Sequence, residues 1–279
     1  MLLEVLEENL LRDVRGALSE DIGSGDITSV LIPADRMATA SVISRESAVL
    51  CGMAWFNAVF AELDTAINVD WDARDGDTIR PGQQLCTLSG PAAPLLSGER
   101  TALNFLQTLS GTATRAQRYA SAVADLAVKI LDTRKTLPGL RQAQKYAVRT
   151  GGCFNHRMGL YDGILIKENH ISAAGSIGQA IQAVKALHPG IPVEIEVENR
   201  DQAKVAIAAG ADILLLDNFT LEALAATVAQ VAGRAKLEAS GGITLDNIRA
   251  VARTGVDFIS IGSLTKDLQS IDLSMKFVE

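Results

Sequence analysis

The second half of the chain repeats one pattern, a short apolar run followed by a helical segment. Six apolar runs can be distinguished, over residues 128–133, 163–169, 192–199, 212–218, 236–242 and 257–263. Helical patterns separate them, near residues 139–151, 173–187, 200–209, 220–232 and 244–254. Repeated β/α units produce a parallel sheet, and polar residues at the C-terminal ends of the strands favour a barrel over an open sheet. Because only six strands are recognisable, we expect an incomplete (β/α) barrel.

The first third of the chain lacks this repeat. Apolar residues spaced near 3.6 predict a helix over residues 2–18, and residues 51–63 also have a helical pattern. The β-prone runs over residues 37–50, 67–71 and 79–90 are separated by turn residues, which predicts an antiparallel sheet. The N-terminal part is therefore expected to combine helices with an antiparallel sheet.

A long helical pattern over residues 97–126 connects the two regions, with an interruption expected near Gly111. We therefore predict an N-terminal domain over residues 1–112 and a barrel domain over residues 113–269. Residues 270–279 contain a strand-like alternation, which we expect to add a strand to the N-terminal domain.

Composition argues against several classes of protein. A formal net charge of -7 and an aromatic content of 4% argue against a nucleic-acid surface. The N-terminus has acidic residues among its leucines, which indicates an amphipathic helix rather than a signal peptide, and no apolar run approaches the length of a membrane span. Cys51, Cys86 and Cys153 lack metal-binding spacing, which favours a reducing compartment, and we expect a cytoplasmic protein.

Residues 132–170 carry a positive charge in an otherwise acidic chain. This segment contains seven lysines and arginines and three acidic residues, which gives a net formal charge of +4. Such a concentration suggests a polyanionic small ligand. Arg141, Lys145 and Arg149 recur at every fourth position, so for these three a solvated helix face is the simpler interpretation. The other basic residues lie at the ends of the predicted elements and are better candidates for ligand binding.

The ends of the last two predicted strands carry glycine. Ser240 and Gly241 end one apolar run, and Gly262 and Ser263 end the next. Free N–H groups at a helix N-terminus bind phosphate, and glycine lets the anion approach the backbone. Glycine at two successive strand ends therefore predicts a phosphate site.

Glu196 and Asp217 are carboxylates in apolar strand contexts. A buried carboxylate requires a partner or a metal ion, and beside phosphates the fitting metal is Mg²⁺. A salt bridge to a lysine or arginine of the same site explains the spacing equally well. Both interpretations stay open from the sequence alone.

Lys167 ends the second strand and has three interpretations. It can reach solvent, pair with Glu196, or act as a Schiff-base lysine in an aldolase-type barrel. Arg134 and Arg157 count against an aldolase, because guanidinium groups suit bidentate capture of carboxylates and phosphates. His156, beside Arg157 in a glycine-flanked loop, is the best histidine candidate for a hydrogen bond to substrate.

These residues fall within motifs that resemble those of the quinolinate phosphoribosyltransferase family. The resembling segments occur in order along almost the whole chain: GDIT (25–28), ERTALNFLQTLSGTAT (99–114), DTRKTLPGLR (132–141), KYAVRTGG (145–152), NHRMGLYDGILIKENHI (155–171), EVEN (196–199), LLLDN (214–218), EASGGI (238–243) and ISIGSLT (259–265). One departure is Lys266, where many relatives have histidine after the final LT.

The resemblance implies an N-terminal α/β sandwich domain, an incomplete α/β barrel and a homodimer whose sites are shared between subunits. It implies phosphoribosyl transfer from 5-phosphoribosyl-1-pyrophosphate (PRPP) to quinolinate with decarboxylation and Mg²⁺, giving nicotinate mononucleotide, pyrophosphate and CO₂ for NAD biosynthesis. It also implies roles for individual residues. Catalysis would involve Lys135, Glu196 and Asp217, of which Glu196 and Asp217 would also hold Mg²⁺ and the ribose. The pyridine would be bound by Arg134, His156, Arg157, Lys167, Thr133, Lys135 and the neighbouring subunit's counterpart of Arg100. The 5-phosphate would contact Ser240, Gly241, Gly262 and Ser263.

Three alternatives remain at this stage. One is a barrel homologue associated with molybdenum transport operons, which the complete set of carboxylate-binding residues argues against. The second is a Schiff-base aldolase using Lys167. The third is a sensor that binds quinolinate or a nucleotide without turnover.

Overall fold

The computed structural model describes the backbone of residues 2–278 and the side chains of residues 8–278. The chain forms two compact units, each assembled from separate segments. The first unit comprises Met1–Gln117, Thr136–Gly152 and Leu264–Glu279, and the second comprises Arg118–Lys135 and Cys153–Ser263. The predicted domains, residues 1–112 and 113–269, stay a prediction, because these compact units alternate along the chain and need not coincide with domains.

The first unit is built on a four-stranded antiparallel sheet. Its strands are β12 (Leu273–Val278), β1 (Met37–Ser44), β5 (Gln84–Pro91) and β3 (Asn68–Trp71), in that spatial order. The C-terminal strand β12 runs along β1 from the Thr39–Val278 pair to the Ser44–Leu273 pair. Two short strands, β2 (Ala48–Val49) and β4 (Thr78–Ile79), form a separate ladder. The chain therefore completes the sheet of its first segment with its last one.

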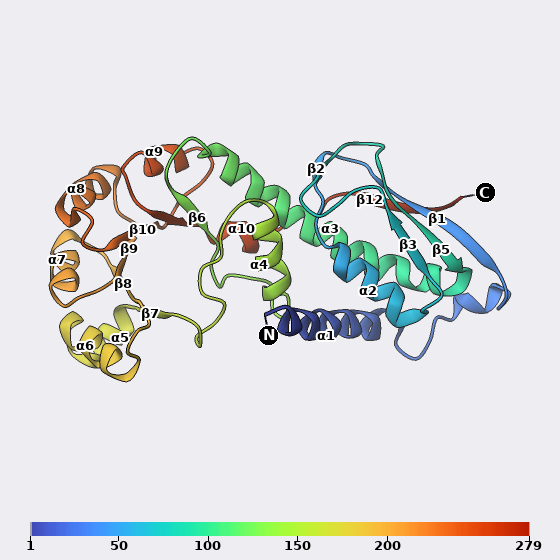
Figure 1. Ribbon diagram of the computed structural model, residues 1–279, viewed down its shortest axis with the longest axis horizontal. Coiled ribbons are helices and arrows are strands. Elements are labelled where there is room, and N and C mark those ends of the chain that lie inside the picture. Colours follow the sequence, from blue (N-terminus) through green and yellow to red (C-terminus); the bar gives the residue numbers. More distant parts are fainter. Residues whose placement is uncertain (1, 279) are drawn as a thin grey trace. The chain divides into compact units, whose positions relative to one another are not determined.

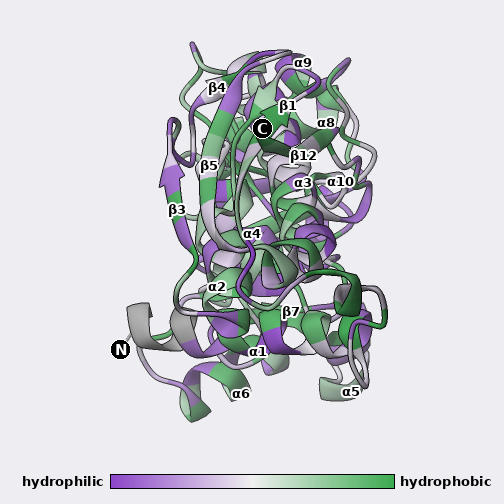
Figure 2. Cartoon of the chain, turned by 90° about the vertical axis from the view of Figure 1, so that its right-hand side faces the viewer, coloured by the Kyte–Doolittle hydropathy of each residue, from purple (hydrophilic) through white to green (hydrophobic). Residues whose placement is uncertain are grey.

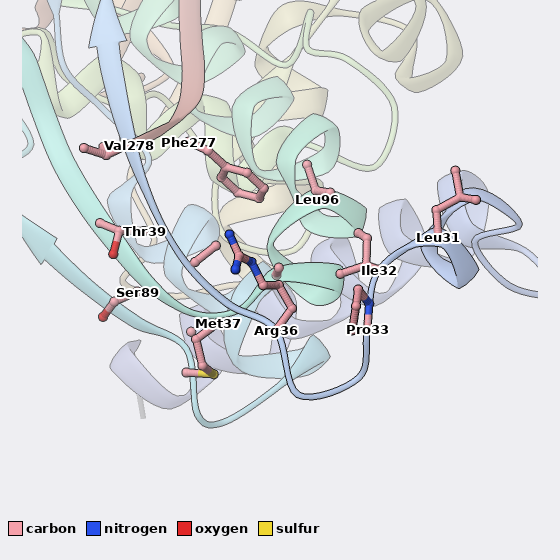
Figure 3. A pocket seen from close by; sticks show the side chains of 13 residues that line it. Leu31, Ile32, Pro33, Arg36, Met37, Thr39, Ser89, Leu96, Phe277 and Val278 are labelled. Atoms are coloured by element: carbon pink, nitrogen blue, oxygen red, sulfur yellow. The ribbon is translucent and has the colours of Figure 1, made fainter.

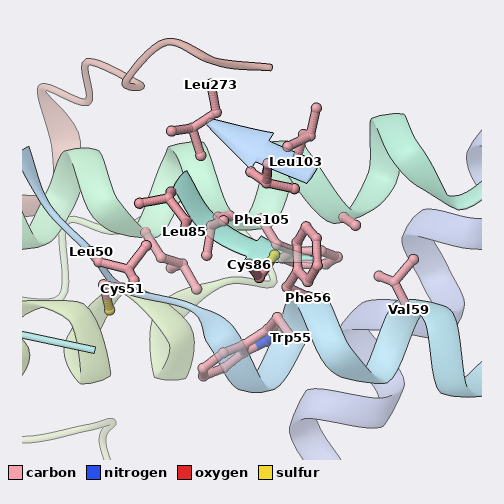
Figure 4. Close-up of a cluster of buried hydrophobic side chains, with 14 of the residues drawn as sticks. Leu50, Cys51, Trp55, Phe56, Val59, Leu85, Cys86, Leu103, Phe105 and Leu273 are labelled. Atoms are coloured by element: carbon pink, nitrogen blue, oxygen red, sulfur yellow. The ribbon is translucent and has the colours of Figure 1, made fainter. Parts of the chain in front are cut away.

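Helices supply the other side of the core of the first unit (Figure 1). They are α1 (Leu2–Ile22), α2 (Met53–Leu63), most of α3 (Ala92–Ala122) and α4 (Arg141–Thr150), whereas the short 3₁₀ helix η1 (Thr28–Leu31) buries none of its residues. Figure 4 shows Trp55, Phe56 and Val59 of α2 gathered with Leu85 and Cys86 of β5 in this core. Apolar side chains buried in this way provide the main favourable free energy of folding.

Two sequence predictions in this unit are wrong. The helix α3 is continuous from Ala92 to Ala122, without the interruption expected near Gly111. Gly111 is needed there for close approach, because a Cβ at this position would collide with the backbone carbonyl of Gln269. The stripe of Arg141, Lys145 and Arg149 is not a uniformly solvated face either, because Arg149 is exposed but Lys145 is completely buried.

The second unit contains a six-stranded parallel sheet. Its spatial order is β6 (Lys129–Leu131), β11 (Phe258–Ser260), β10 (Lys236–Ser240), β9 (Ile213–Asp217), β8 (Val193–Val197) and β7 (Ile164–Ile166). The strands β6 and β7 are the two edges, and no ladder joins them in the described part of the chain. This architecture confirms the predicted incomplete barrel.

The helices of the second unit lie outside its strands, as Figure 1 shows for α6 to α9. They are α5 (Glu168–Ala174), α6 (Ile177–Leu187), α7 (Arg200–Ala208), α8 (Leu221–Val231) and α9 (Ile248–Ala252). After β11 the chain forms α10 (Ser263–Lys266), of which all but Ser263 belongs to the first unit. Ser176, Asn199 and Thr220 begin α6, α7 and α8 by accepting hydrogen bonds from backbone N–H groups of the first turn. These side chains satisfy donors that a helix leaves unpaired, so each loop leads directly into its helix.

The hydropathy of the strands agrees with their positions in the antiparallel sheet. The edge strand β3 is largely hydrophilic in Figure 2, whereas the neighbouring β5 buries Leu85, Cys86 and Leu88. A polar edge strand discourages pairing with another sheet. No helix in the described residues combines the length and the apolar character that crossing a membrane requires.

Candidate active site

The carboxyl ends of the parallel strands bring most of the predicted site residues to one edge of the second unit. Thr133, Arg134 and Lys135 follow β6, and Lys167 follows β7. Glu196 and Asp217 lie in the last residues of β8 and β9, and Ser240 pairs with Asp217 across the sheet. Parallel strands all end at the same edge, so residues distant in sequence share one site.

Glu196, Asp217 and Lys167 form a charged group at this edge. The Lys167 Nζ lies 3.0 Å from the Glu196 Oε2. Burial and the charge of Glu196 raise the pKa of Asp217, while Lys167 and Lys135 act in the opposite direction. Of the two interpretations of Glu196, the salt bridge is therefore present in the structure. Two adjacent carboxylates that repel each other also fit a hard divalent cation, which binds oxygen ligands and relieves the repulsion.

The two glycine-bearing strand ends allow close backbone approach. Gly241 has φ +95°, and a Cβ there would collide with the side chain of Asn218. Gly262 lies against Lys135, whose Cδ would be 2.8 Å from a Cβ at that position. Beside it, the Ser263 Oγ is 3.4 Å from the Tyr119 hydroxyl. Glycine at both positions thus lets a neighbouring side chain approach the backbone, and binding of a phosphate there stays a prediction.

Arg157 lies in a loop held by its own polar groups. Its Nη1 donates to the Gly163 carbonyl at 3.0 Å, and Asp162 accepts the backbone N–H groups of Met158 and Gly159. Burial and the neighbouring charge of Arg134 lower the pKa of Arg157. Two guanidinium groups within electrostatic reach of each other favour a ligand with more than one negative charge.

His156 is anchored on both sides of its ring. Its Nδ1 accepts the Arg157 backbone N–H at 2.7 Å, and its Nε2 is 3.0 Å from the Glu194 Oε2. Its own backbone N–H donates to the buried Asp132 at 2.9 Å. Both ring nitrogens thus face protein groups, and the hydrogen bond from His156 to substrate stays a prediction.

Glu238 was not identified from the sequence, although it lies beside this histidine. Its Oε2 is 3.7 Å from the His156 Nε2, and its side chain is 2% exposed. The available signal was an acidic residue within an apolar strand, two positions before Ser240.

Two further residues singled out from the sequence lie outside this group. Arg100 lies on α3 in the first unit, where its side chain is exposed. Lys266 lies 3.5 Å from the neighbouring Asp267.

The environment of Lys167 does not favour a Schiff-base lysine. Its side chain is 47% exposed and is paired with Glu196. A nucleophilic lysine of that kind needs a neutral amine, which burial away from carboxylates provides. The arrangement instead suits a cation that holds an anionic ligand.

Comparison with known proteins agrees with this geometry. A family model described as quinolinate phosphoribosyl transferase, N-terminal domain, matches residues 26–110, and the corresponding C-terminal domain model matches residues 112–276. A probable nicotinate-nucleotide pyrophosphorylase (carboxylating) of Bacillus subtilis is 44% identical over 92% of this chain and 89% of its own length. The nicotinate-nucleotide pyrophosphorylase (carboxylating) of Mycobacterium leprae is 40% identical over 98% of this chain and 99% of its own.

A solved structure extends the similarity to three dimensions. The nicotinate-nucleotide pyrophosphorylase of Francisella tularensis superposes with a TM-score of 0.92 at 45% identity, covering 97% of this chain and 96% of that one. The C-terminal family model thus spans the strand ends described above, and the similarity to the solved structure covers almost the whole chain. The chain belongs to the quinolinate phosphoribosyltransferase family.

Proposed function

We propose that the protein transfers the phosphoribosyl group of PRPP to quinolinate with decarboxylation, producing nicotinate mononucleotide, pyrophosphate and CO₂ in NAD biosynthesis. The observation that carries the proposal is the grouping of Arg134, Arg157 and Lys167 with two carboxylates and two glycine-bearing strand ends. Such a site can hold a dicarboxylate next to a phosphorylated sugar. The relatives named nicotinate-nucleotide pyrophosphorylase support the same chemistry.

The pyridine substrate is assigned to the basic residues. Arg134, Arg157 and Lys167 bind the two carboxylates, with Thr133, His156 and the neighbouring subunit's counterpart of Arg100 completing the contacts. Holding both carboxylates orients the pyridine nitrogen toward C1 of the ribose, which lowers the entropic cost of reaction. Lys135 contacts both substrates.

The phosphoribosyl donor is assigned to the opposite side of the site. Glu196 and Asp217 hold the ribose and Mg²⁺, and Ser240, Gly241, Gly262 and Ser263 hold the 5-phosphate. Bound Mg²⁺ supplies positive charge for the departing pyrophosphate. Lys135 adds a positive charge where negative charge develops. After transfer, the alkylated ring nitrogen accepts the electrons that decarboxylation releases.

One assay tests the function. Purified protein is mixed with quinolinate, PRPP and Mg²⁺, and pyrophosphate and CO₂ are measured together. The proposal expects both products in equal amounts, and it expects Arg134→Ala to abolish them while the protein stays folded. Binding of quinolinate without either product would support the sensor instead, and full activity of Arg134→Ala would overturn the site assignment.

The protein is also proposed to act as a homodimer. An apolar surface of the first unit supports this: Leu31, Met37, Phe277 and Val278 line a hollow of about 860 Å³ around Arg36 (Figure 3). These four side chains are between 43% and 79% exposed. Exposed apolar side chains that gather in one hollow make this surface a candidate for contact with a second subunit. A cytoplasmic location is part of the proposal, supported by three buried cysteines that form no disulfide.

Complementation between inactive variants tests the shared site. Arg100→Ala and Arg134→Ala are each expected to lose activity, but a heterodimer of the two contains one site with both arginines. Coexpression with random pairing should recover about a quarter of native specific activity, because half the dimers are mixed and each has one intact site. Heterodimers that are purified and remain inactive would contradict a site shared between subunits.

A further inference from the structure

His156 lies in a cluster with two buried glutamates, Glu194 and Glu238, which have no role in the proposed chemistry. We call His156, Glu194 and Glu238 the buried acid cluster. The side chains of Glu194 and Glu238 are 6% and 2% exposed, and that of His156 is 14% exposed. Two carboxylates buried at one point are costly unless protons or cations compensate their charge. Their presence therefore requires an explanation.

Hydrogen bonds determine which ring nitrogen of His156 carries the proton. Its Nδ1 accepts the Arg157 N–H, so in the neutral ring the proton lies on Nε2. That Nε2 then donates to the Glu194 Oε2 at 3.0 Å, and the Glu238 Oε2 lies 3.7 Å away. The ring is thus held between the backbone of the arginine loop and the two glutamates.

Glu238 completes the arrangement from the far side. Burial, followed by the charge of Glu194, raises the pKa of Glu238 to about 7. A protonated Glu238 can donate to Glu194 and keep it in place as the acceptor of His156. Glu194 and Glu238 each have one further oxygen, Oε1, that is buried without a hydrogen-bond partner among the described residues. The carboxylates are therefore held by each other, by the histidine and by the Ser260 side chain, which hydrogen-bonds to Glu238.

The cluster acts directly on the position of Arg157. The backbone N–H that His156 accepts belongs to Arg157 itself, and the charge of Glu194 opposes the effects of burial and of Arg134 on that guanidinium. A shift of the histidine ring would move the Arg157 backbone from which the side chain extends. Substrate-binding groups need support of this kind, because small displacements weaken charged contacts.

We propose that Glu238 is a positioning residue for quinolinate: acting through Glu194 and His156, it fixes Arg157 in the orientation that receives a substrate carboxylate. The inference rests on the proposed function. Glu238 touches neither substrate in this view, so its removal affects the dicarboxylate and leaves the phosphoribosyl donor bound as before. The conservative Glu238→Gln retains a donor of the same size and is expected to recover binding.

Calorimetric titration of quinolinate in the presence of EDTA and, separately, of PRPP in the presence of Mg²⁺ tests the proposal. Glu238→Ala should weaken quinolinate binding about tenfold or more, because a buried charged hydrogen bond is disturbed, with PRPP affinity within about twofold of native. Glu238→Gln should stay within about threefold for both ligands. Glu222→Ala, which removes an exposed glutamate on α8, serves as the charge-matched control.

Several outcomes would overturn the positioning role. These are native quinolinate affinity in folded Glu238→Ala, equal losses for quinolinate and PRPP, or Glu238→Gln as impaired as alanine. If Glu238→Ala does not fold, Glu238→Asp withdraws the carboxyl by one methylene and replaces it in the test. Turnover by the native enzyme is measured separately, so its absence would refute the proposed function and not the positioning role.

Discussion

The Lys167 Nζ and the Glu196 Oε2 lie 3.0 Å apart and link the ends of the neighbouring strands β7 and β8. In this pair Lys167 lies at the same edge as Asp217, whose pKa the charge of Glu196 raises. The arrangement joins the part of the site proposed for the pyridine to the part proposed for the metal and ribose. Changing one member of the pair should therefore affect both substrates.

The exposed, paired Lys167 should not form a covalent adduct with sugar phosphates. Treatment with borohydride in the presence of aldehyde or ketose phosphates is expected to leave its mass unchanged, because the amine is exposed and paired with the Glu196 carboxylate, whereas a Schiff-base lysine is buried away from carboxylates. Peptide mass spectrometry provides the measurement, with an aldolase of the Schiff-base type as the positive control. A trapped adduct at Lys167 would revive the aldolase interpretation.

Asp217→Asn should stabilise the metal-free protein while reducing its activity. Burial and Glu196 both disfavour the Asp217 carboxylate, so removing its charge is expected to raise the unfolding temperature in EDTA by about 1–3 °C. Asp246→Asn, at an exposed carboxylate, is the control and should change little. Mg²⁺ with PRPP should raise the unfolding temperature of the native protein more than that of Asp217→Asn. An equal rise in both proteins would argue against Asp217 as a metal ligand.

Gly241→Ala should be more damaging than Gly242→Ala. Both glycines have positive φ, which costs an alanine about 1–2 kcal/mol, but only a Cβ at Gly241 meets another group within 4 Å, the side chain and backbone of Asn218. Because Asn218 donates to Asp217, the larger residue should also disturb that carboxylate. Urea unfolding and the KM for PRPP measure the two effects. Equal losses in both variants would show that backbone strain alone matters.

The raised pKa of Glu238 predicts a pH-dependent stability. Between its ordinary value of 4.5 and about 7, the folded protein holds a proton that the unfolded chain has released. The unfolding free energy therefore decreases as pH rises through this window. Glu238→Gln cannot release that proton, so its stability relative to the native protein should increase from pH 5 to pH 8. Unfolding temperatures at several pH values test this, and parallel curves would contradict it.

Several features of the fold could be predicted from local patterns because their cause is local. The alternation of apolar runs and helices predicts the β/α units, and polar residues at strand ends predict which edge carries the site. Gly111 shows where local patterns fail. Glycine inside a helix usually indicates weakness, yet here it admits the carbonyl of Gln269 to an unbroken helix.

The spacing of charged residues likewise predicted only part of the structure. The spacing of Arg141, Lys145 and Arg149 describes one side of a helix, but it contains no information about what covers that side, and Lys145 is buried. Glu238 was missed for a related reason. A single acidic residue in an apolar strand gains meaning only when Glu194 and His156, from distant segments, are found beside it.

The sequence by itself determined the type of elements, the incomplete barrel, the family resemblance and the residues that carry charge at the strand ends. These depend on periodicity and residue type, which act over a few positions along the chain. The tertiary structure alone decided that Lys167 pairs with Glu196, that both nitrogens of His156 face protein groups, and that two glutamates share one buried space. Such contacts depend on distances between segments far apart in sequence, and burial and charge act through those distances.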